Sequence, residues 1–302
     1  MKTLRFLKDH KQFTIFGLLA IGVILVAVFA PWIAPKDPLE AVMSDSLLPP
    51  GGEYLCGTDK LGRDVLSRVI YGTRTSLVMT LCLVAVIFVV GTTLGVIAGY
   101  FGGIVDEIIM RIADMMISFP GLVLAIAIAG MLGPNMVNAV IAISAVSWTK
   151  YARLARSLVL RIRKNVYIEA AVVTGTRTKD ILLRYVLPNM ITTLIVTAAA
   201  DIGTMMLELA SLSFLGFGAT APTPEWGLML NEGRTYLAKA PWLMIYPGIA
   251  IVIVVVIFNM LGAWSSPSRE KAMQPDVTES RETFRSISKK SRTRNSCGKT
   301  II

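Results

Sequence analysis

Long apolar stretches alternate with polar and charged segments along this chain. A helix needs about 20 mostly apolar residues to cross roughly 30 Å of hydrocarbon. Six stretches approach this length: 13–33, 77–98, 115–132, 136–149, 190–214 and 242–261. We therefore expect an all-α polytopic membrane protein with six transmembrane helices. The fourth stretch is short, and we expect its helix to continue into the amphipathic residues that follow it.

Composition supports the same class. Hydrophobic residues make up 54% of the 302 positions and charged residues only 17%, whereas soluble domains carry about 25% charged residues. Cysteine is sparse, with three residues in the whole chain, so we expect no disulfide framework. The apolar excess has no place in a water-soluble core, and it is accounted for by membrane spans in contact with lipid.

The distribution of charge predicts the orientation of the spans. Lysine and arginine are retained on the cytoplasmic side of a membrane. The segment 149–189 carries nine basic and two acidic residues, whereas 35–75 carries five and six. We expect both termini and 149–189 in the cytoplasm. The net charge of +10 is then a topology signal, and its dispersal over separate loops argues against a nucleic-acid partner.

The polar segment 149–189 is too long for an ordinary connection and contains helical patterns. Apolar residues recur at helical spacing over 151–164, and two shorter helices are expected at 167–173 and 179–186, with Gly175 between them. Pro188 suits the first turn of the fifth span or a break just before it. The alternative is an amphipathic connection that lies on anionic lipid.

One motif in this segment favours a specific interpretation over the lipid-bound connection. It combines Glu169, Ala170, Ala171, Gly175, Leu187 and Pro188 at fixed spacing. This pattern resembles the coupling loop of the membrane subunit of ATP-binding-cassette importers, although Tyr185 stands where that loop usually carries isoleucine. The resemblance implies that a cytoplasmic ATPase grips the loop and moves it as a lever.

Three further segments narrow the resemblance. Residues 57–68, 211–218 and 222–227 are similar to segments of dipeptide, oligopeptide and nickel importer permeases, and the likeness extends over residues 10–262. The chain resembles the second permease of the pair, with a type I transmembrane domain. The family implies a location in the bacterial inner membrane. It also implies a homologous second permease, two ATPases and an extracytoplasmic solute-binding protein. ATP and Mg²⁺ bind to the ATPases, so we expect no cofactor in this chain.

The resemblance also divides the chain and leaves the substrate open. We expect an N-terminal part at 1–75, a permease domain at 76–262 with its coupling loop at 165–189, and a basic, disordered tail at 263–302. The tail lacks the usual family ending after Gly262, and we interpret it as the product of a shifted reading frame. Peptide and nickel carriers share these motifs, so the sequence does not separate the two substrates.

A candidate docking site for the binding protein lies after the first span. Its residues are Gly57, Thr58, Asp59, Gly62, Arg63 and Asp64. The alternative is a purely structural role as a turn and a helix cap. Trp226 and Trp242 fit interfacial anchors at the membrane surface.

No residue pattern predicts catalysis or a bound metal ion. The single histidine, His10, precludes a histidine-based triad and a two-histidine zinc motif. Gly298, Lys299 and Thr300 resemble the end of a phosphate-binding loop, but Thr293 occupies the position of its first glycine. We therefore expect a transport subunit and not an enzyme.

Two acidic residues of the fifth span are candidates for the substrate path. Asp201 and Glu208 are seven positions apart, so they share one helix face, and charges inside a membrane usually face protein or a watery route. A buried hydrogen bond to a neighbouring helix is the alternative. An ion-coupled secondary transporter that uses both acids is the alternative function. Glycines at 91, 95 and 99 predict a close helix–helix contact.

Overall fold

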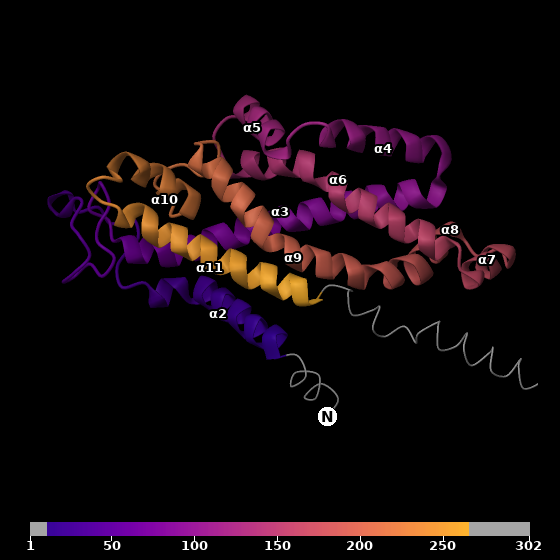
Figure 1. Ribbon diagram of the computed structural model, residues 1–302, viewed down its shortest axis with the longest axis horizontal. Helices are drawn as coiled ribbons and strands as arrows, with labels where there is room; N and C mark the ends of the chain where they lie inside the picture. Colours follow the sequence, from indigo (N-terminus) through magenta and orange to yellow (C-terminus); the bar gives the residue numbers. More distant parts are fainter. Residues whose placement is uncertain (1–10, 266–302) are drawn as a thin grey trace, which may run out of the picture. The chain divides into compact units, whose positions relative to one another are not determined.

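The computed structural model describes residues 11–265, with the side chains of residues 14–262. This part of the chain is built from helices and the segments that connect them, the longest of which is 34–64 between α2 and α3 (Figure 1). Residues 1–10 and 266–302 lie outside the described part, so the expected disordered tail and the shifted reading frame are untested from residue 266 onward. The elements are α2 (Lys11–Ile33), η1 (Met43–Asp45), α3 (Val65–Phe101), α4 (Gly103–Ile117), α5 (Gly121–Leu132), α6 (Met136–Arg163), α7 (Val166–Val173), α8 (Thr178–Ile181), η2 (Leu182–Val186), α9 (Leu187–Phe214), α10 (Trp226–Gly233), η3 (Arg234–Tyr236) and α11 (Trp242–Ser265).

Four predicted spans are confirmed as long apolar helices. Within residues 11–265, the segments long and apolar enough to cross a membrane are Thr14–Ile33, Val65–Phe101, Thr178–Phe214 and Trp242–Gly262. They contain nearly all of the predicted stretches 13–33, 77–98, 190–214 and 242–261. The α2 helix packs against α3 and α11, and α11 packs along α9 (Figure 1).

The predicted third span, 115–132, is wrong as a single helix. The structure places its residues in two helices, α4 and α5, which are bent by 92° relative to each other. Pro120 is the last residue of the short break and the N-cap of α5. Proline disfavours a helical conformation at the residue before it and cannot donate a backbone hydrogen bond, so α4 ends before this position.

The predicted count of six spans is not confirmed. The described residues contain four candidate spans, or five if α4 and α5 together form one broken span. The α6 helix runs without interruption for 28 residues, so the short apolar stretch 136–149 does continue into amphipathic residues as expected. Its second half carries several basic residues, and these explain why α6 does not qualify as a wholly apolar span.

The close helix contact predicted from the glycines of α3 is confirmed, and its partner is α6. A Cβ atom on Gly99 would lie 3.0 Å from the backbone oxygen of Arg156, and Cβ atoms on Gly91 and Gly95 would overlap the backbone oxygens of Trp148 and Ala152. Glycine removes the only atom that would hold the two backbones apart. The stripe therefore serves packing within the chain.

The helices α8, η2 and α9 join end to end into one rod of 37 residues, Thr178–Phe214. The turn Leu182–Val186 is π-helical and directly precedes α9, whose first turn contains Pro188. A proline inside a helix lacks one hydrogen bond and clashes with the carbonyl four residues earlier. A π-helical turn widens the backbone at this point. The break considered before Pro188 is thus replaced by a local change of helix type.

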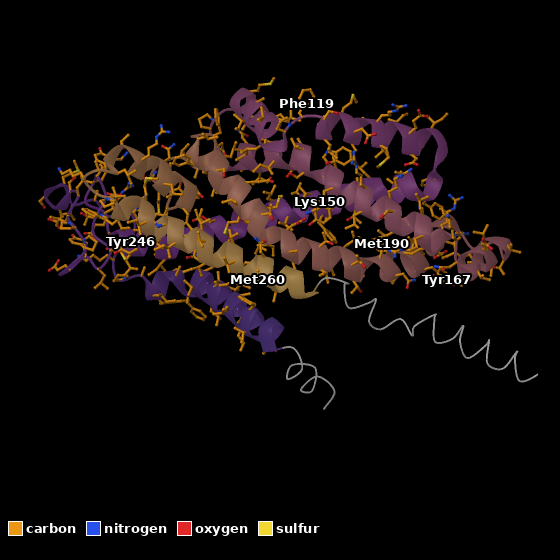
Figure 2. The ribbon with its side chains drawn as sticks, in the orientation of Figure 1. Phe119, Lys150, Tyr167, Met190, Tyr246 and Met260 are labelled. Atoms are coloured by element: carbon orange, nitrogen blue, oxygen red, sulfur yellow. The ribbon has the colours of Figure 1, made fainter. Side chains whose placement is uncertain are left out.

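Buried apolar side chains form two clusters in the described residues. The first joins α3, α5, α6, α7 and α9 and includes Leu83, Ile143, Ile168 and Met190. The second joins α2, α3, α9, α10 and α11 and includes Trp226. Figure 2 shows Met190 on α9 and Tyr167 on α7 toward the same end of the helices. The first cluster therefore connects the short helix α7 to the long helices.

Candidate functional site

The predicted junction at Gly175 is present and has a defined geometry. The α7 helix ends at Val173, and Gly175 follows with φ +75°. The amide of Gly175 donates to the carbonyl of Val172, and the amide of Thr176 donates to the carbonyl of Ala171, both at 3.0 Å. These two bonds form a Schellman motif, which requires a left-handed residue after the helix. Glycine adopts that conformation without a Cβ clash.

The α7 helix has one buried face and one exposed face. Ile168 and Ala171 are buried in the first apolar cluster. Val166, Ala170 and Val173 lie at positions i, i+4 and i+7 and are exposed, with Val173 at 87%. These three residues, which we call the outer face of α7, share one side of the helix. An exposed apolar side on a short helix is typical of an interaction surface.

The residues of the coupling motif divide between these two environments. Glu169, Ala170, Gly175 and Pro188 are exposed, whereas Ala171 is buried and Leu187 is partly buried against the first cluster. Of the two alanines in the motif, only Ala170 is open to a partner. Ala171 instead lets α7 approach its own chain closely.

The unusual Tyr185 of the motif packs locally. Its ring lies 6.5 Å from the ring of Tyr167, centroid to centroid. The amide of the Asn189 side chain donates to the carbonyl of Tyr185 at 2.6 Å. The tyrosine at this position therefore helps to hold α7 against the beginning of the rod.

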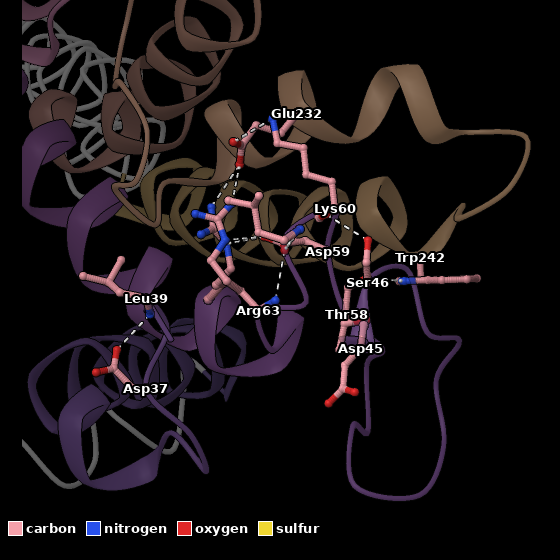
Figure 3. A network of polar contacts seen from close by, with 12 residues as sticks. Asp37, Leu39, Asp45, Ser46, Thr58, Asp59, Lys60, Arg63, Glu232 and Trp242 are labelled. Carbon is pink, nitrogen blue, oxygen red and sulfur yellow. Dashed lines mark hydrogen bonds and ion pairs between the residues drawn. The ribbon is translucent and has the colours of Figure 1, made fainter. Parts of the chain in front are cut away.

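A charged cluster lies where the segment before α3 meets α10 (Figure 3). Arg63 Nε contacts Asp59 Oδ2 at 2.6 Å, and Arg63 Nη2 and Arg68 Nη2 contact Glu232 Oε2 at 3.3 and 3.1 Å. Lys60 Nζ lies 3.4 Å from Glu232 Oε1. The side chains of Arg63 and Arg68 are only 2% and 1% exposed. The cluster thus ties α10 to α3 by ion pairs shielded from water.

The predicted docking residues are buried and serve this part of the fold. Gly57 and Gly62 have φ values of +74° and +72°, and a Cβ on either residue would meet the backbone of a neighbouring segment. Asp64 caps α3 by accepting the amide of Ser67 at 2.8 Å. The structural role considered for this segment therefore has direct contacts in its favour, and docking of a binding protein stays a prediction. The six residues Gly57, Thr58, Asp59, Gly62, Arg63 and Asp64 are all buried.

The interpretation of Trp226 as an interfacial anchor is wrong. Its side chain is 1% exposed, and its indole Nε1 donates to the carbonyl of Val69 at 3.0 Å. Gly72 leaves the space that the indole ring fills. Trp242 is partly buried and donates from Nε1 to the carbonyl of Thr58 at 3.2 Å. Both rings therefore join segments that are distant in sequence.

The two acids of α9 face one open cavity of about 330 Å³. Thr204 and Met205, which lie between Asp201 and Glu208 on the same face of the helix, also line it. The shared face predicted from the spacing is thus confirmed, while a role in the substrate path stays untested. The remaining walls come from α3, α4, α5, α6 and the turn between α4 and α5; they are formed by Ile87, Met116, Ile117, Phe119, Gly121, Val146, Ser147, Thr149, Lys150 and Tyr151.

Asp201 is held by two residues that sequence reasoning had not paired with it. Lys150 Nζ donates to Asp201 Oδ1 at 2.6 Å, and Tyr151 Oη donates to Oδ2 at 2.9 Å. Figure 2 shows Lys150 at the centre of the molecule, where α6 passes α9. The one signal in the sequence was the position of Lys150 directly after the apolar stretch 136–149. The buried hydrogen bond considered as the alternative is present for Asp201.

Comparison with known proteins identifies the family. Residues 91–271 match the family described as "Binding-protein-dependent transport system inner membrane component", and residues 2–50 match the "N-terminal TM domain of oligopeptide transport permease C". The first match covers more than half of the chain.

Relatives in bacteria agree with both matches. A dipeptide transport permease of Alkalihalophilus pseudofirmus is 44% identical over 85% of this chain and 84% of its own length. A di/tripeptide transport permease of Pseudomonas aeruginosa is 40% identical over 84% and 86%. A nickel transport permease of Escherichia coli is 39% identical over 79% and 86%.

A solved structure shows the same fold. It is the inward-facing MetNI methionine ABC transporter, with a TM-score of 0.54 at 20% identity over 65% of this chain and 93% of the compared chain. Membership of the family implies partner ATPase and substrate-binding proteins, and it gives the chain a multi-pass place in the membrane as a transport subunit and not an enzyme. The chain belongs to the family of binding-protein-dependent transport system inner membrane components, as a permease subunit of an ATP-binding-cassette importer.

Proposed function

We propose that this chain forms one half of the translocation path of an importer for short peptides. A homologous second permease supplies the other half, two cytoplasmic ATPases drive the cycle and an extracytoplasmic solute-binding protein delivers the cargo. Both termini lie in the cytoplasm. Relatives named as dipeptide and di/tripeptide permeases support the peptide cargo. A relative named as a nickel permease makes nickel the competing outcome of the test.

The outer face of α7 is the observation that carries the coupling role. Val166, Ala170 and Val173 leave apolar surface uncovered, beside Glu169, which makes no ion pair with a described residue. A cleft in an ATPase that encloses this face removes apolar area from water, and a cation in the cleft pairs with Glu169. The opposite face is anchored in the chain's own core. A force applied to α7 therefore reaches the long helices.

The coupling requires two packed arrangements that the ATPases bind unequally. Moving an equilibrium from 1:99 to 99:1 takes about 5.5 kcal/mol of differential binding. ATP-bound partners that grip α7 in one arrangement supply this difference. The cavity beside Asp201 and Glu208 then lies on the translocation path, which opens alternately to the outside and to the cytoplasm.

Uptake in proteoliposomes that contain the assembled importer tests both the cargo and the coupling. We expect ATP-dependent uptake of radiolabelled dialanine and none of radioactive nickel. Uptake of nickel alone would overturn the peptide assignment and leave the coupling role intact. Uptake that continues without ATP would overturn the coupling role.

A charge on the outer face of α7 isolates the ATPase contact. We expect Val173→Glu to abolish ATP-dependent uptake and co-purification of the ATPases, because it places a carboxylate in the apolar contact. Ile104→Glu is the matched control, since Ile104 is an exposed apolar residue at the start of α4, outside the coupling loop 165–189. Equal loss in both variants, or retention of the ATPases by Val173→Glu, would contradict the assignment of this face.

A further inference from the structure

The cavity between α6 and α9 contains two carboxylates but only one cation. Lys150, Asp201 and Glu208 are the charged side chains that line it. The side chain of Asp201 is only 7% exposed, and both of its oxygens are occupied, one by the Lys150 ammonium and one by the Tyr151 hydroxyl. Asp201 therefore has its charge and its hydrogen-bonding capacity satisfied by the chain itself.

Glu208 is in a different situation. It lies two helical turns from Asp201 on the same face of α9, and it forms no hydrogen bond or ion pair with any residue in the part of the chain that the structure describes. Its surroundings in the cavity include apolar side chains such as Met116, Phe119 and Met205. A carboxylate in an apolar setting at membrane depth is costly unless a cation pairs with it.

The contact between Lys150 and Asp201 shows which cation suits this cavity. A primary ammonium, with three N–H donors, fits against a carboxylate there at 2.6 Å. The free amino terminus of a peptide is also a primary ammonium. The cavity volume of about 330 Å³ falls in the range of small-molecule sites, about 300 to 1,000 Å³.

We propose that Glu208 binds the α-ammonium of the peptide during its passage, so that the cavity is a subsite for one free amino terminus. This inference rests on the proposed import of short peptides. Asp201 is a positioning residue, because its pairing with Lys150 keeps that cation away from Glu208. A peptide with an acylated amino terminus has no such cation, and it leaves the Glu208 carboxylate unpaired. The subsite therefore discriminates by the charge of the amino terminus.

Cysteine protection in the assembled importer tests the subsite without relying on transport. Thr204→Cys, which places a thiol in the same cavity and leaves Glu208 intact, is made in a background in which Cys56, Cys82 and Cys297 are serine, and the rate of its modification by a cationic methanethiosulfonate reagent is measured. A second measurement uses unmodified Glu208 and records uptake of dialanine at saturating binding protein. Uptake by the serine background shows that the importer is intact before either result is interpreted.

Charge restoration provides the decisive readout. We expect Glu208→Cys to lose at least tenfold in dialanine uptake and to regain most of it after modification with an anionic thiosulfonate, but not after modification with a neutral one of similar size. A purely structural role for Glu208 would show no such dependence on charge. Glu107→Gln, at an exposed acid of α4, is the control for loss of one carboxylate and should leave uptake unchanged.

Protection by ligand separates ammonium recognition from simple occlusion. We expect dialanine, but not N-acetyl-dialanine, to slow modification of the Thr204→Cys thiol at concentrations that saturate uptake, because Glu208 is intact in this variant. Equal protection by both peptides, or by neither, would overturn the proposal. If the unmodified importer takes up no dialanine at all, the proposed peptide function fails; if it does so and the anionic reagent restores nothing, only the subsite fails.

Discussion

Gly95 of α3 lies directly against the backbone carbonyl of Ala152 in α6, so closely that a Cβ atom on the glycine would overlap the oxygen. Backbone cannot yield as a flexible side chain can. The contact between the two helices therefore depends on the absence of a side chain at this position, and the same holds for Gly91 one turn earlier.

We expect Gly95→Ala to lower stability by about 1–3 kcal/mol, the usual cost of forcing an extra group into a packed contact. The measurement is the thermal unfolding midpoint of the purified protein in detergent. Gly248→Ala is the matched control, because a Cβ at Gly248 of α11 would meet no atom within 4 Å. An equal effect of the two substitutions would show that the α3–α6 contact tolerates a methyl group.

The charged cluster around Glu232 predicts a large effect from a small chemical change. Glu232→Gln removes the carboxylate that faces two nearly buried arginines, Arg63 and Arg68. Removing one partner of a buried ion pair costs about 3–5 kcal/mol, and we expect a loss of that order in chemical unfolding. Glu53→Gln, at an exposed pair with Lys36, should have a much smaller effect, because water screens this pair. Similar values for both variants would contradict the shielding of the cluster.

The conformation of Gly175 predicts a graded response to substitution. A Cβ at Gly175 would meet no atom within 4 Å, so the cost of a side chain comes from its φ of +75°. That cost is about 1–2 kcal/mol for an ordinary L-residue and smaller for asparagine. We expect uptake and ATPase co-purification to fall in the order glycine, asparagine, alanine. If alanine and asparagine behave alike, the left-handed conformation is not what the coupling needs.

Glu225 predicts a pH dependence of stability. This residue caps α10, where its two carboxylate oxygens accept the amides of Gly227 and Leu228 at 2.8 and 2.7 Å. Burial raises the pKa of its carboxyl above the ordinary value of 4.5, and the backbone hydrogen bonds only partly oppose this.

A carboxyl whose pKa is raised by folding binds protons more tightly in the folded state. Stability therefore falls as the pH rises from about 4.5 through the folded-state pKa. We expect Glu225→Gln to remove this component, so that the difference in unfolding midpoint between variant and parent changes with pH over that window. A difference that stays constant with pH would show that Glu225 does not contribute.

The sequence was sufficient for features that depend on local pattern. The apolar stretches of α2, α3, α9 and α11, the junction at Gly175 and the glycine contact of α3 all follow from spacing within one segment. Pro120 is a local signal for the break between α4 and α5. The apolar content of 115–132 nevertheless led to the prediction of a single helix there. The six-span count is not confirmed, because composition does not report where α4 and α5 bend and because α6 carries basic residues in its second half.

Features that depend on distant partners could not be obtained in this way. The pairing of Lys150 with Asp201 joins residues 51 positions apart, and the contacts of Glu232 with Arg63 and Arg68 span more than 160 positions. A single sequence contains the charges but not their distances. For the same reason, a buried role for Trp226 could not be distinguished from a place at the membrane surface.

The π-helical turn before Pro188 keeps the rod Thr178–Phe214 unbroken from the loop to the cavity. The helical backbone hydrogen bonds continue from the loop to the cavity, so a displacement at the loop is passed along the helix. From Thr178 to Glu208 the axial length is about 45 Å at about 1.5 Å per residue, so a tilt of about 5° at the loop swings Glu208 sideways by roughly 4 Å. Angular displacement at one end thus becomes a change of cavity width at the other.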